Sequence, residues 1–444
     1  MTTQELFGHQ RISRVLLRLA PPVMFSQLIQ ALYNIVDSFF IGRSGETGLT
    51  ALSIIYPIQL LMIALAVGTG VGINTLMARK LGCGRNEESR KCAGMAAPLA
   101  LILWAVFALA GFFFMPFYAR LGSGTEEVIS DVIVYGRIVC IFSFGLFLES
   151  GWTKVLQSEG NMRLPMLAQI IGALVNIILD PLLIFGFSYG SIVFPALGIR
   201  GAAYATVTGQ IAAALVVMKK GFKRSPKFAN FVPYSSLIFK FGLPNILMQS
   251  AYTFYILGLN LILKTFSDQA VTALGLYYKW QTFFFIPLGA MQTCVVPVIS
   301  YNYGSGQLDR CRKTVRESIL FGMALMFAGT LCFEFIAELM FRFFTKDEEV
   351  IKIGVWGFKF IGVSFIPMVT SLMFPVVFQA LGLVFKSCFL TILRTVVLFV
   401  PLGWLFSRLG LQYFWLTFPI TESLTTIAGL FFYVKLKPAP SSPV

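Results

Sequence analysis

Two related stretches decide the fold of this chain: Leu19-Ala-Pro-Pro-Val-Met-Phe-Ser-Gln27 and Phe241-Gly-Leu-Pro-Asn-Ile-Leu-Met-Gln249. They pair Pro22 with Pro244 and Gln27 with Gln249, which are each 222 positions apart. This constant shift of 222 in residue number is called the repeat offset from here on. The same ungapped offset relates residues in other regions: Tyr33 with Tyr255, Gln59 with Gln281, Gly82-Cys-Gly84 with Gly304-Ser-Gly306, Arg90-Lys91 with Arg312-Lys313, Gln157 with Gln379, and Gly160 with Gly382. One offset that serves separated regions indicates an internal duplication.

The composition is that of an integral membrane protein. Of the 444 residues, 57% are hydrophobic and 12% are charged, about half the charged share of a soluble domain. This excludes disordered, collagen-like and disulfide-scaffold classes. Twelve apolar segments are each long enough to cross a bilayer, which takes about 20 residues of helix, at 14–41, 49–79, 92–118, 128–153, 164–187, 196–218, 236–264, 271–300, 317–344, 350–380, 387–407 and 410–434. Strict apolar/polar alternation is missing, so we expect an all-α polytopic fold and not a barrel.

The distribution of Lys and Arg orients these spans. Of the 35 basic residues, 23 fall in segments on the side of the N-terminus, eight on the opposite side and four within spans. The positive-inside rule then predicts a multi-pass protein of the cytoplasmic membrane with both termini in the cytoplasm. The net charge of +15 therefore needs no nucleic-acid partner. No cleavable signal peptide is evident at the N-terminus.

The duplication predicts two lobes of the same orientation, because each half holds six spans. We expect an N-lobe at 1–218, a cytoplasmic linker at 219–235, a C-lobe at 236–436 and a disordered tail at 437–444. Parallel repeats in transporters are related by an axis along the membrane normal, and the substrate site lies between them near mid-membrane. A two-lobed transporter is the expected architecture.

Two pairs of polar residues within spans of the first half are candidates for ion coupling. Tyr33 and Asp37 are four residues apart and share a helical face, as do Asn176 and Asp180. Ionisable groups within hydrocarbon are costly and mark ion or proton pathways. A carboxylate beside hydrogen-bonding groups suits a proton, a sodium ion or a cationic ligand. The alternative is that each aspartate lies at the outer end of its helix and simply reaches water.

The second half lacks these acids. At the repeat offset, Asp37 meets Leu259, Asn176 meets Leu398 and Asp180 meets Leu402. We therefore expect coupling chemistry in one lobe and a substrate wall in the other. Polar residues elsewhere in the spans are candidate cavity-lining residues, with internal pairing as the alternative for the charged ones: Gln30, Asn34, Glu149, Gln249, Lys279 and Gln281. Arg394 and Glu422 could pair within the second lobe, which the sequence alone does not test.

Other sources of chemistry are excluded by what the sequence contains. The single histidine, His9, lies in the N-terminal tail, so a histidine relay is excluded. The seven cysteines are scattered and form no CxxC pair, which argues against a metal centre. No phosphate-binding loop of the G-x-x-x-x-G-K-[ST] type is present, so ATP is not the expected energy source. An ion gradient remains, with no other cofactor.

At these residues the chain resembles the multidrug and toxic compound extrusion (MATE) family of secondary transporters. The resemblance covers roughly residues 12–436, and its motifs are specific through their order and spacing. They are Leu19-Ala-Pro-Pro22, Tyr33-Asn-Ile-Val-Asp37-Ser-Phe-Phe-Ile-Gly42, Gly82-Cys-Gly84, Glu159-Gly160-Asn161, Asn176-Ile-Ile-Leu-Asp180-Pro181 and Gly198-Ile-Arg-Gly201-Ala-Ala-Tyr-Ala-Thr206.

The resemblance implies export of amphipathic, mainly cationic small molecules by a monomer, coupled to inward H+ or Na+. It implies a coupling site in the first lobe, built from Tyr33, Asp37, Asn176, Asp180 and Thr206, with Na+ as one candidate occupant. A proline that bends the first helix on protonation corresponds to Pro22. The chain departs from the family pattern because Gln157 replaces a common arginine and the second lobe has no matching carboxylate.

Two rival functions fit parts of the sequence. A lipid-linked saccharide flippase of the same superfamily often has additional helices and a cationic cavity, for which Lys279 and Arg137 would be candidates. A membrane enzyme would need clustered catalytic groups, and none converges in this sequence. We therefore predict a transporter and not an enzyme.

Overall fold

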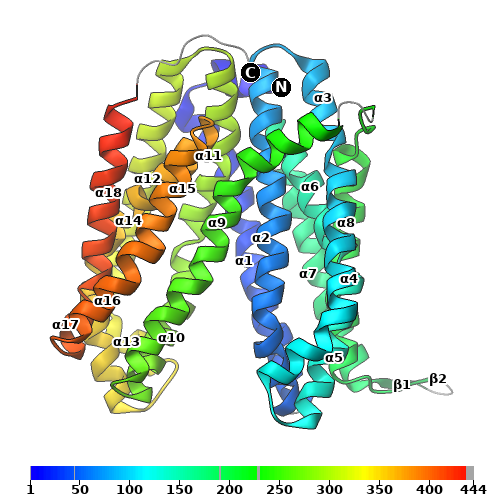
Figure 1. The fold of residues 1–444 in the computed structure, drawn as a ribbon, viewed down its shortest axis with the longest axis vertical. Helices are drawn as coiled ribbons and strands as arrows, with labels where there is room; N and C mark the ends of the chain where they lie inside the picture. The colour runs from blue at the N-terminus through cyan, green and yellow to red at the C-terminus, as the bar shows by residue number, and fades with distance from the viewer. Residues whose placement is uncertain (1, 45, 190–191, 228–230, 437–444) are drawn as a thin grey trace. The chain divides into compact units, whose positions relative to one another are not determined.

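The computed structural model describes residues 2–44, 46–189, 192–227 and 231–436, so the predicted tail at 437–444 lies outside the described residues. The first half forms eight helices (Figure 1): α1 (Ile12–Ser44), α2 (Glu46–Gly82), α3 (Asn86–Gly94), α4 (Ala96–Gly122), α5 (Glu126–Ile141), α6 (Phe144–Ser158), α7 (Arg163–Phe185) and α8 (Ile199–Gly221). A short antiparallel hairpin of β1 (Phe187–Tyr189) and β2 (Ile192–Phe194) joins α7 to α8.

The second half repeats this plan with more breaks. Its helices are α9 (Phe231–Lys264), α10 (Asp268–Phe284), α11 (Ile286–Gly304), α12 (Leu308–Phe335), α13 (Ala337–Arg342), α14 (Glu348–Ala380), α15 (Val384–Ile392), α16 (Val400–Ser407), α17 (Leu411–Phe414) and α18 (Thr417–Val434). Within the described residues the chain also has π-helical segments: η1 (Glu5–His9) precedes α1 in the first half, and η3 (Leu393–Phe399) lies between α15 and α16 in the second.

Each of the twelve predicted spans falls on one helix or on a broken run of helices, which confirms the all-α polytopic fold. Among the described residues, nine helices are long and apolar enough to cross a membrane, or eleven if two bent pairs each count as one span. The bent pairs are α5 with α6, at 43°, and α10 with α11, at 51°. The twelfth predicted span corresponds to α18, which is not in that count and carries Glu422.

The duplication is visible in the backbone of the turns. Gly84 and Gly306, which the repeat offset pairs, both follow a helix with positive φ, at 74° and 75°. Gly160 and Gly382 have the same relation, at 83° and 80°. Glycine adopts this left-handed conformation at no steric cost, whereas a Cβ atom would strain it. The two halves therefore end equivalent helices with equivalent turns.

The chain divides into two compact units that differ from the predicted lobes at both starts. One unit, called the N-lobe from here on, is Pro21–Gly242. The other, called the C-lobe, combines Met1–Ala20 with Leu243–Val444. The first turns of α1 therefore belong to the C-lobe, although the rest of α1 lies in the N-lobe. The first turns of α9 belong to the N-lobe, although the rest of α9 lies in the C-lobe. The repeat offset also relates the two points of division, which follow Ala20 and Gly242.

Buried polar contacts explain why the N-terminal residues belong to the C-lobe. Phe7 in η1 is fully buried, and its ring meets Tyr301 edge-on with centroids 5.7 Å apart. Arg310 Nη2 donates to the carbonyl oxygens of Phe7, at 2.7 Å, and Gln10, at 2.8 Å. Asn302 Nδ2 also donates to the Phe7 carbonyl, at 3.1 Å. These bonds satisfy backbone groups that would otherwise be buried without partners.

Close backbone approach explains why the start of α9 belongs to the N-lobe. A Cβ atom on Gly72 of α2 would lie 2.0 Å from the carbonyl oxygen of Ile238, and one on Gly242 would lie 2.4 Å from that of Gly68. Only glycine permits two helices to touch in this way. The first turns of α9 are therefore packed directly on α2.

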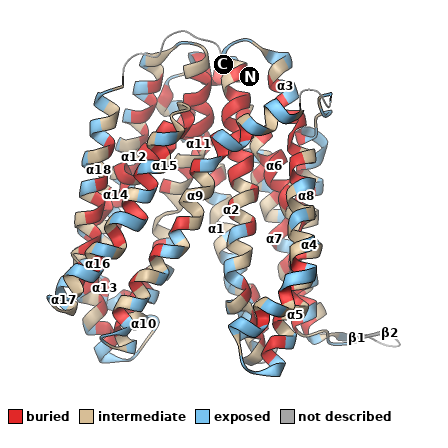
Figure 2. Cartoon of the chain, viewed as in Figure 1, coloured by how far each residue is buried: buried red, intermediate tan, exposed pale blue. Residues whose placement is uncertain are grey.

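The two lobes are filled by different kinds of side chain. Alanine and glycine dominate the buried face of α8. The C-lobe core is aromatic: Phe333 stacks on Phe358 with ring centroids 4.1 Å apart, and Phe365 lies 4.7 Å from Phe333. Most of α14 is buried in this core, as Figure 2 shows by colour. Small residues thus bring N-lobe helices close together, whereas large rings fill the space between C-lobe helices.

Candidate functional site

Glycines hold α7 against α8 and thereby position the polar residues of the N-lobe. A Cβ atom on Gly209 would lie 2.6 Å from the carbonyl oxygen of Gly172, and the reverse distance is 2.9 Å. Gly209 is also the neighbour of Asn176, whose own Cβ atom would lie 3.2 Å from a Cβ atom added to Gly209. The Thr206 side chain, one turn earlier on α8, is consequently held on the same part of the interface.

The structure brings the predicted coupling residues together inside the N-lobe. Asp37, Asn176, Asp180 and Thr206 are all buried, from helices α1, α7 and α8. Asn176 Nδ2 donates to Asp180 Oδ1 at 3.3 Å, as their spacing of four residues predicts. The carboxyl groups of Asp37 and Asp180 are close enough for their charges to interact. The Tyr33 phenol is close enough to both carboxyl groups to interact with their charge.

Several polar atoms of this cluster have no partner within the described residues. They are Asp37 Oδ1, Asp180 Oδ2, Asn176 Oδ1 and Thr206 Oγ1. Neither aspartate forms an ion pair with a Lys or Arg in the described part of the chain. Two carboxylates this close repel each other unless a proton or a cation lies with them. The cluster therefore offers acceptor oxygens to one positive charge.

The described residues hold no group of three or more His, Cys, Asp or Glu side chains that fits a metal centre. The donors of the cluster are carboxylate, amide and hydroxyl oxygens, the hard ligands that suit a proton or an alkali cation. Chemically, these oxygens are suited to hold a proton or one monovalent cation.

Sequence reasoning missed one residue beside this cluster. Tyr135 of α5 is fully buried, its hydroxyl accepts a hydrogen bond from Gln59 Nε2 at 3.3 Å, and it lies near enough to Asp37 to interact with its charge. A tyrosine within an apolar span is usually a core residue, so no pattern in the sequence distinguishes it. Gln59 carried a signal, because the repeat pairs it with Gln281.

The structure places the remaining N-lobe candidates apart from this cluster or at its edge. Glu149 is buried in α6 and accepts hydrogen bonds from Thr153 Oγ1, at 2.7 Å, and Gln169 Nε2, at 3.1 Å. Gln30 and Asn34 on α1 are exposed. Pro22 lies inside α1, which runs without a break from Ile12 to Ser44. Whether any of these residues lines a substrate cavity stays a prediction.

The C-lobe candidates are spread over two helices. Gln249 Nε2 donates to Asn245 Oδ1 at 2.8 Å, within α9. Gln281 is buried in α10, and its Oε1 accepts from the Tyr252 hydroxyl at 3.4 Å. Lys279 is exposed, and its Nζ lies 5.2 Å above the ring of Phe344, where a cation–π attraction holds it. Their role in substrate contact also stays a prediction.

The C-lobe neutralises its own buried charges, which confirms the predicted pair. Arg394 Nη2 lies 2.6 Å from Glu422 Oε1, and Arg394 Nε donates to both carboxylate oxygens, at 3.0 and 3.1 Å. The Ser371 hydroxyl donates to Glu422 as well. The positions that the repeat offset assigns to Asn176 and Asp180, together with the next residue in each case, are apolar: Leu398, Phe399, Leu402 and Gly403. Whether the halves are aligned at the repeat offset or one residue further, the C-lobe has no polar residue at the positions that match Asn176 and Asp180.

Comparison with known proteins identifies relatives along the whole chain. The MatE family model matches residues 22–182 and again 244–405, and the repeat offset relates the starts of the two matches. A protein named as an FAD transporter from Shewanella oneidensis is 26% identical over 432 residues, covering 94% of this chain and 93% of its own. The multidrug export protein MepA of Staphylococcus aureus is 23% identical, covering 98% and 97%.

Solved structures share the fold. An outward-facing multidrug resistance MATE family transporter superposes with a TM-score of 0.89 at 23% identity, covering 97% of this chain and 96% of that one. A transporter of the MOP superfamily from Pyrococcus furiosus, described as having a binding pocket of reverse polarity, gives a TM-score of 0.88 at 24% identity, with 97% and 96% covered.

Proposed function

Since this chain belongs to the MatE family and is therefore a multi-pass membrane transporter and not an enzyme, we propose that it exports small amphipathic molecules by antiport against H+ or Na+. The named activity of MepA, multidrug export, supports the direction and the substrate class. The acidic cluster in the N-lobe supports the coupling and a preference for organic cations.

One observation carries the coupling proposal. Asp37 and Asp180 are buried within reach of each other, and no basic side chain among the described residues pairs with either. Arg394 and Glu422 of the C-lobe show the opposite arrangement, in which a buried acid is neutralised by the protein itself. A buried acidic pair that the protein leaves unpaired is stable only with a bound positive charge.

The coupling cycle follows from these contacts. A proton or Na+ enters the cluster and removes the repulsion between Asp37 and Asp180, while Tyr33, Asn176 and Thr206 adjust their hydrogen bonds to the occupied state. The first helix, α1, carries Asp37 and also Pro22, where a missing backbone hydrogen bond allows it to bend. Bending there would link ion binding to alternating access between the lobes.

The remaining features of the proposal concern location and assembly. We place both termini in the cytoplasm and the protein in the cytoplasmic membrane, which the bias of basic residues supports. The energy source is the ion gradient alone, without a cofactor, and the working unit is a monomer. Nucleic acid has no part in this function.

Transport by the purified protein in proteoliposomes tests the coupling. We expect Asp37→Asn and Asp180→Asn each to reduce gradient-driven dye transport at least tenfold, because an amide cannot bind and release a proton. Asp268→Asn is the matched control: Asp268 is an exposed acid in the first turn of α10, so its variant should transport normally. H+ and Na+ gradients are imposed separately to identify the ion.

Undiminished transport by both N-lobe variants would overturn the coupling site. The substrate class is tested in the same vesicles by comparing a cationic dye with FAD, because one relative is named for FAD transport. Faster gradient-driven transport of FAD than of the dye would contradict the preference for cations while leaving the coupling proposal intact.

A further inference from the structure

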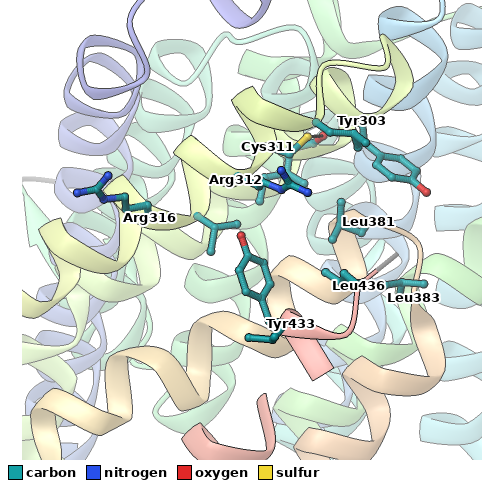
Figure 3. Close-up of a pocket in the computed structure, with 12 residues that line it drawn as sticks. Tyr303, Cys311, Arg312, Arg316, Leu381, Leu383, Tyr433 and Leu436 are labelled. Carbon is teal, nitrogen blue, oxygen red and sulfur yellow. Dashed lines mark hydrogen bonds between the residues drawn. The ribbon is translucent and has the colours of Figure 1, made fainter. Parts of the chain in front are cut away.

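The C-lobe contains a lined cavity that the proposed transport cycle does not use. It has a volume of about 470 Å3 and lies among α11, the start of α12, the turn between α14 and α15, and the end of α18. Figure 3 shows its basic and aromatic side: Arg312 and Arg316 extend from α12 to opposite sides, and the Tyr433 ring lies beneath Arg312. Leucines 381, 383 and 436 form an apolar wall.

A second hollow continues the first along the outside of the lobe. It has a volume of about 640 Å3, lies between α12, α14 and α18, and shares Val315, Arg316 and Tyr433 with the first cavity. Its lining on α12 reaches from Val315 to Met323, which is about 12 Å of helix. Together the two hollows form one groove, called the C-lobe groove here, that is basic at one end and apolar along the other.

The threonine hydroxyls of the apolar part are turned inward. The hydroxyls of Thr370 and Thr426 both donate to the carbonyl oxygen of Pro367, each at 2.8 Å. Their hydrogen-bonding capacity is thus used within the protein, and the rest of this lining is mainly apolar, with Ser423 and Tyr433 as its other uncharged polar residues. Such a lining favours a hydrocarbon chain over a polar ligand.

The two arginines at the basic end are not fully neutralised by acidic side chains of the described residues. Arg312 is 66% exposed and lies 3.6 Å from Asp309, an acid that is itself 98% exposed, so water weakens this pair. Arg316 forms no ion pair within the described part of the chain. The two arginines stand one turn apart where α12 passes from basic to apolar residues, which is where lipid phosphates lie in a bilayer.

The equivalent position in the N-lobe is covered by other residues of the same lobe. The repeat pairs Arg312 with Arg90, but it pairs Arg316 with Gly94. A Cβ atom on Gly94 would lie 2.2 Å from the carbonyl oxygen of Arg224, and the Ser225 hydroxyl donates to the Gly94 carbonyl at 3.2 Å. The segment that contains Arg224 and Ser225 therefore fills the equivalent position in the N-lobe, whereas the C-lobe position holds a second arginine.

We propose that the C-lobe groove binds one anionic phospholipid of the surrounding membrane. The phosphate lies at the basic end marked by Arg312 and Arg316, and one acyl chain lies in the apolar part between α12, α14 and α18. The pairing of a basic end with a continuous apolar channel fits a lipid, whereas a free phosphate would use only the first and a neutral lipid only the second. The bound lipid joins three helices of the C-lobe along their outer face.

Native mass spectrometry of the purified protein tests this proposal. In an equimolar mixture of phosphatidylglycerol and phosphatidylcholine with identical chains, we expect the protein to retain one phosphatidylglycerol preferentially. The double variant R312Q/R316Q should weaken this binding about tenfold, since two charge-assisted contacts are lost. Arg90→Gln, the repeat counterpart in the N-lobe, is the matched control and should bind as the natural protein does.

A second pair of variants on α18 tests the acyl part. Leu430 lines the groove, whereas Ile427 is exposed on the same helix and does not. Leu430→Trp should abolish the rise in melting temperature that phosphatidylglycerol produces, and Ile427→Trp should preserve it. Because each variant is compared with and without lipid, a general loss of stability does not imitate this result.

Four outcomes would overturn the proposal. The first is equal retention of phosphatidylcholine, and the second is unchanged lipid binding by R312Q/R316Q. The third is equal stabilisation by inorganic phosphate or glycerol phosphate, which would make the cavity a site for soluble anions. The fourth is a large gain in lipid binding when the chain is ended after Leu436, which would assign the groove to the chain's own C-terminal residues.

Discussion

Asp180 and Glu422 are both acids buried completely within a lobe, and their surroundings assign them different roles. Glu422 receives three hydrogen bonds from Arg394 and one from Ser371. Asp180 receives one from Asn176 and keeps an oxygen without a partner among the described residues. A neutralised acid serves packing, whereas an acid that lacks a counter-charge remains available to an ion. The difference between the lobes on which the proposed coupling rests thus begins at single side chains.

The Arg394–Glu422 pair gives a prediction about stability. Replacing Arg394 by Met leaves a buried carboxylate without its partner and should lower the free energy of unfolding by about 3–5 kcal/mol. The double variant R394M/E422L should recover most of this loss, because it removes both charges. Thermal unfolding of the purified variants in detergent measures the effect.

An exposed arginine provides the control for that experiment. Arg342 pairs with Glu338 and Glu348, both at 2.8 Å, on the surface of the C-lobe. Arg342→Met should change the melting temperature little, because water already screens the pair. If R394M and the double variant were equally destabilised, the loss would come from packing, and the account of neutralised charge would be wrong.

At the scale of helices, the N-lobe site depends on how closely α7 approaches α8. Backbone contact at Gly172 and Gly209 sets the distance between the two helices. This short distance brings Asn176 of α7 and Thr206 of α8 into one cluster. In the C-lobe the repeat counterpart of Gly172 is Arg394, and the same stretch contains the π-helical segment η3. Segments of π-helix are often found at functional or altered positions of a helix. The two lobes thus diverge at the same place in the repeat.

A single methyl group tests the importance of this approach. Gly209→Ala would place a Cβ atom 2.6 Å from a backbone oxygen, so the helices must separate, at a cost of about 1–3 kcal/mol. We expect transport to fall several-fold, since the cluster is pulled apart. Gly275→Ala is the control: it lies in α10, and an added Cβ would meet nothing within 4 Å. That variant should retain full transport and should not lose stability; equal loss in both would contradict this account.

For the whole molecule, the sequence predicts the spans well because each is a long apolar window between charged breaks. It does not predict the bends of 43° and 51° within two of them, since hydropathy carries no information about backbone direction. It also misses the exchange of helix starts between the units, because which helix packs on which is a property of tertiary contacts. Asp37, Asn176 and Asp180 could be found as rare polar groups in apolar surroundings, whereas Tyr135 could not.

The exchange predicts how the two halves behave as separate chains. Residues 1–229 alone lack the first turns of α9 that pack on Gly72 and Gly68, and residues 230–444 alone lack Phe7 and its contact with Arg310. We expect each fragment alone to aggregate, and the two to purify together when both are produced. Deleting residues 2–11 from the first fragment should weaken this association, as size-exclusion chromatography would show. Two fragments that are each monodisperse alone would contradict the prediction.

The same exchange has a consequence for the history of the chain. In this chain the first turns of α1 and of α9 each pack in the unit formed by the other half. A single six-helix protein has no second half in which its opening helix could pack in this way. Two identical copies could have done so, each completing the other. Fusion of two such copies into one chain would give the division after Ala20 and Gly242 that the protein shows. Covalently joined halves can diverge, and in this chain one half has acids where the other has leucines.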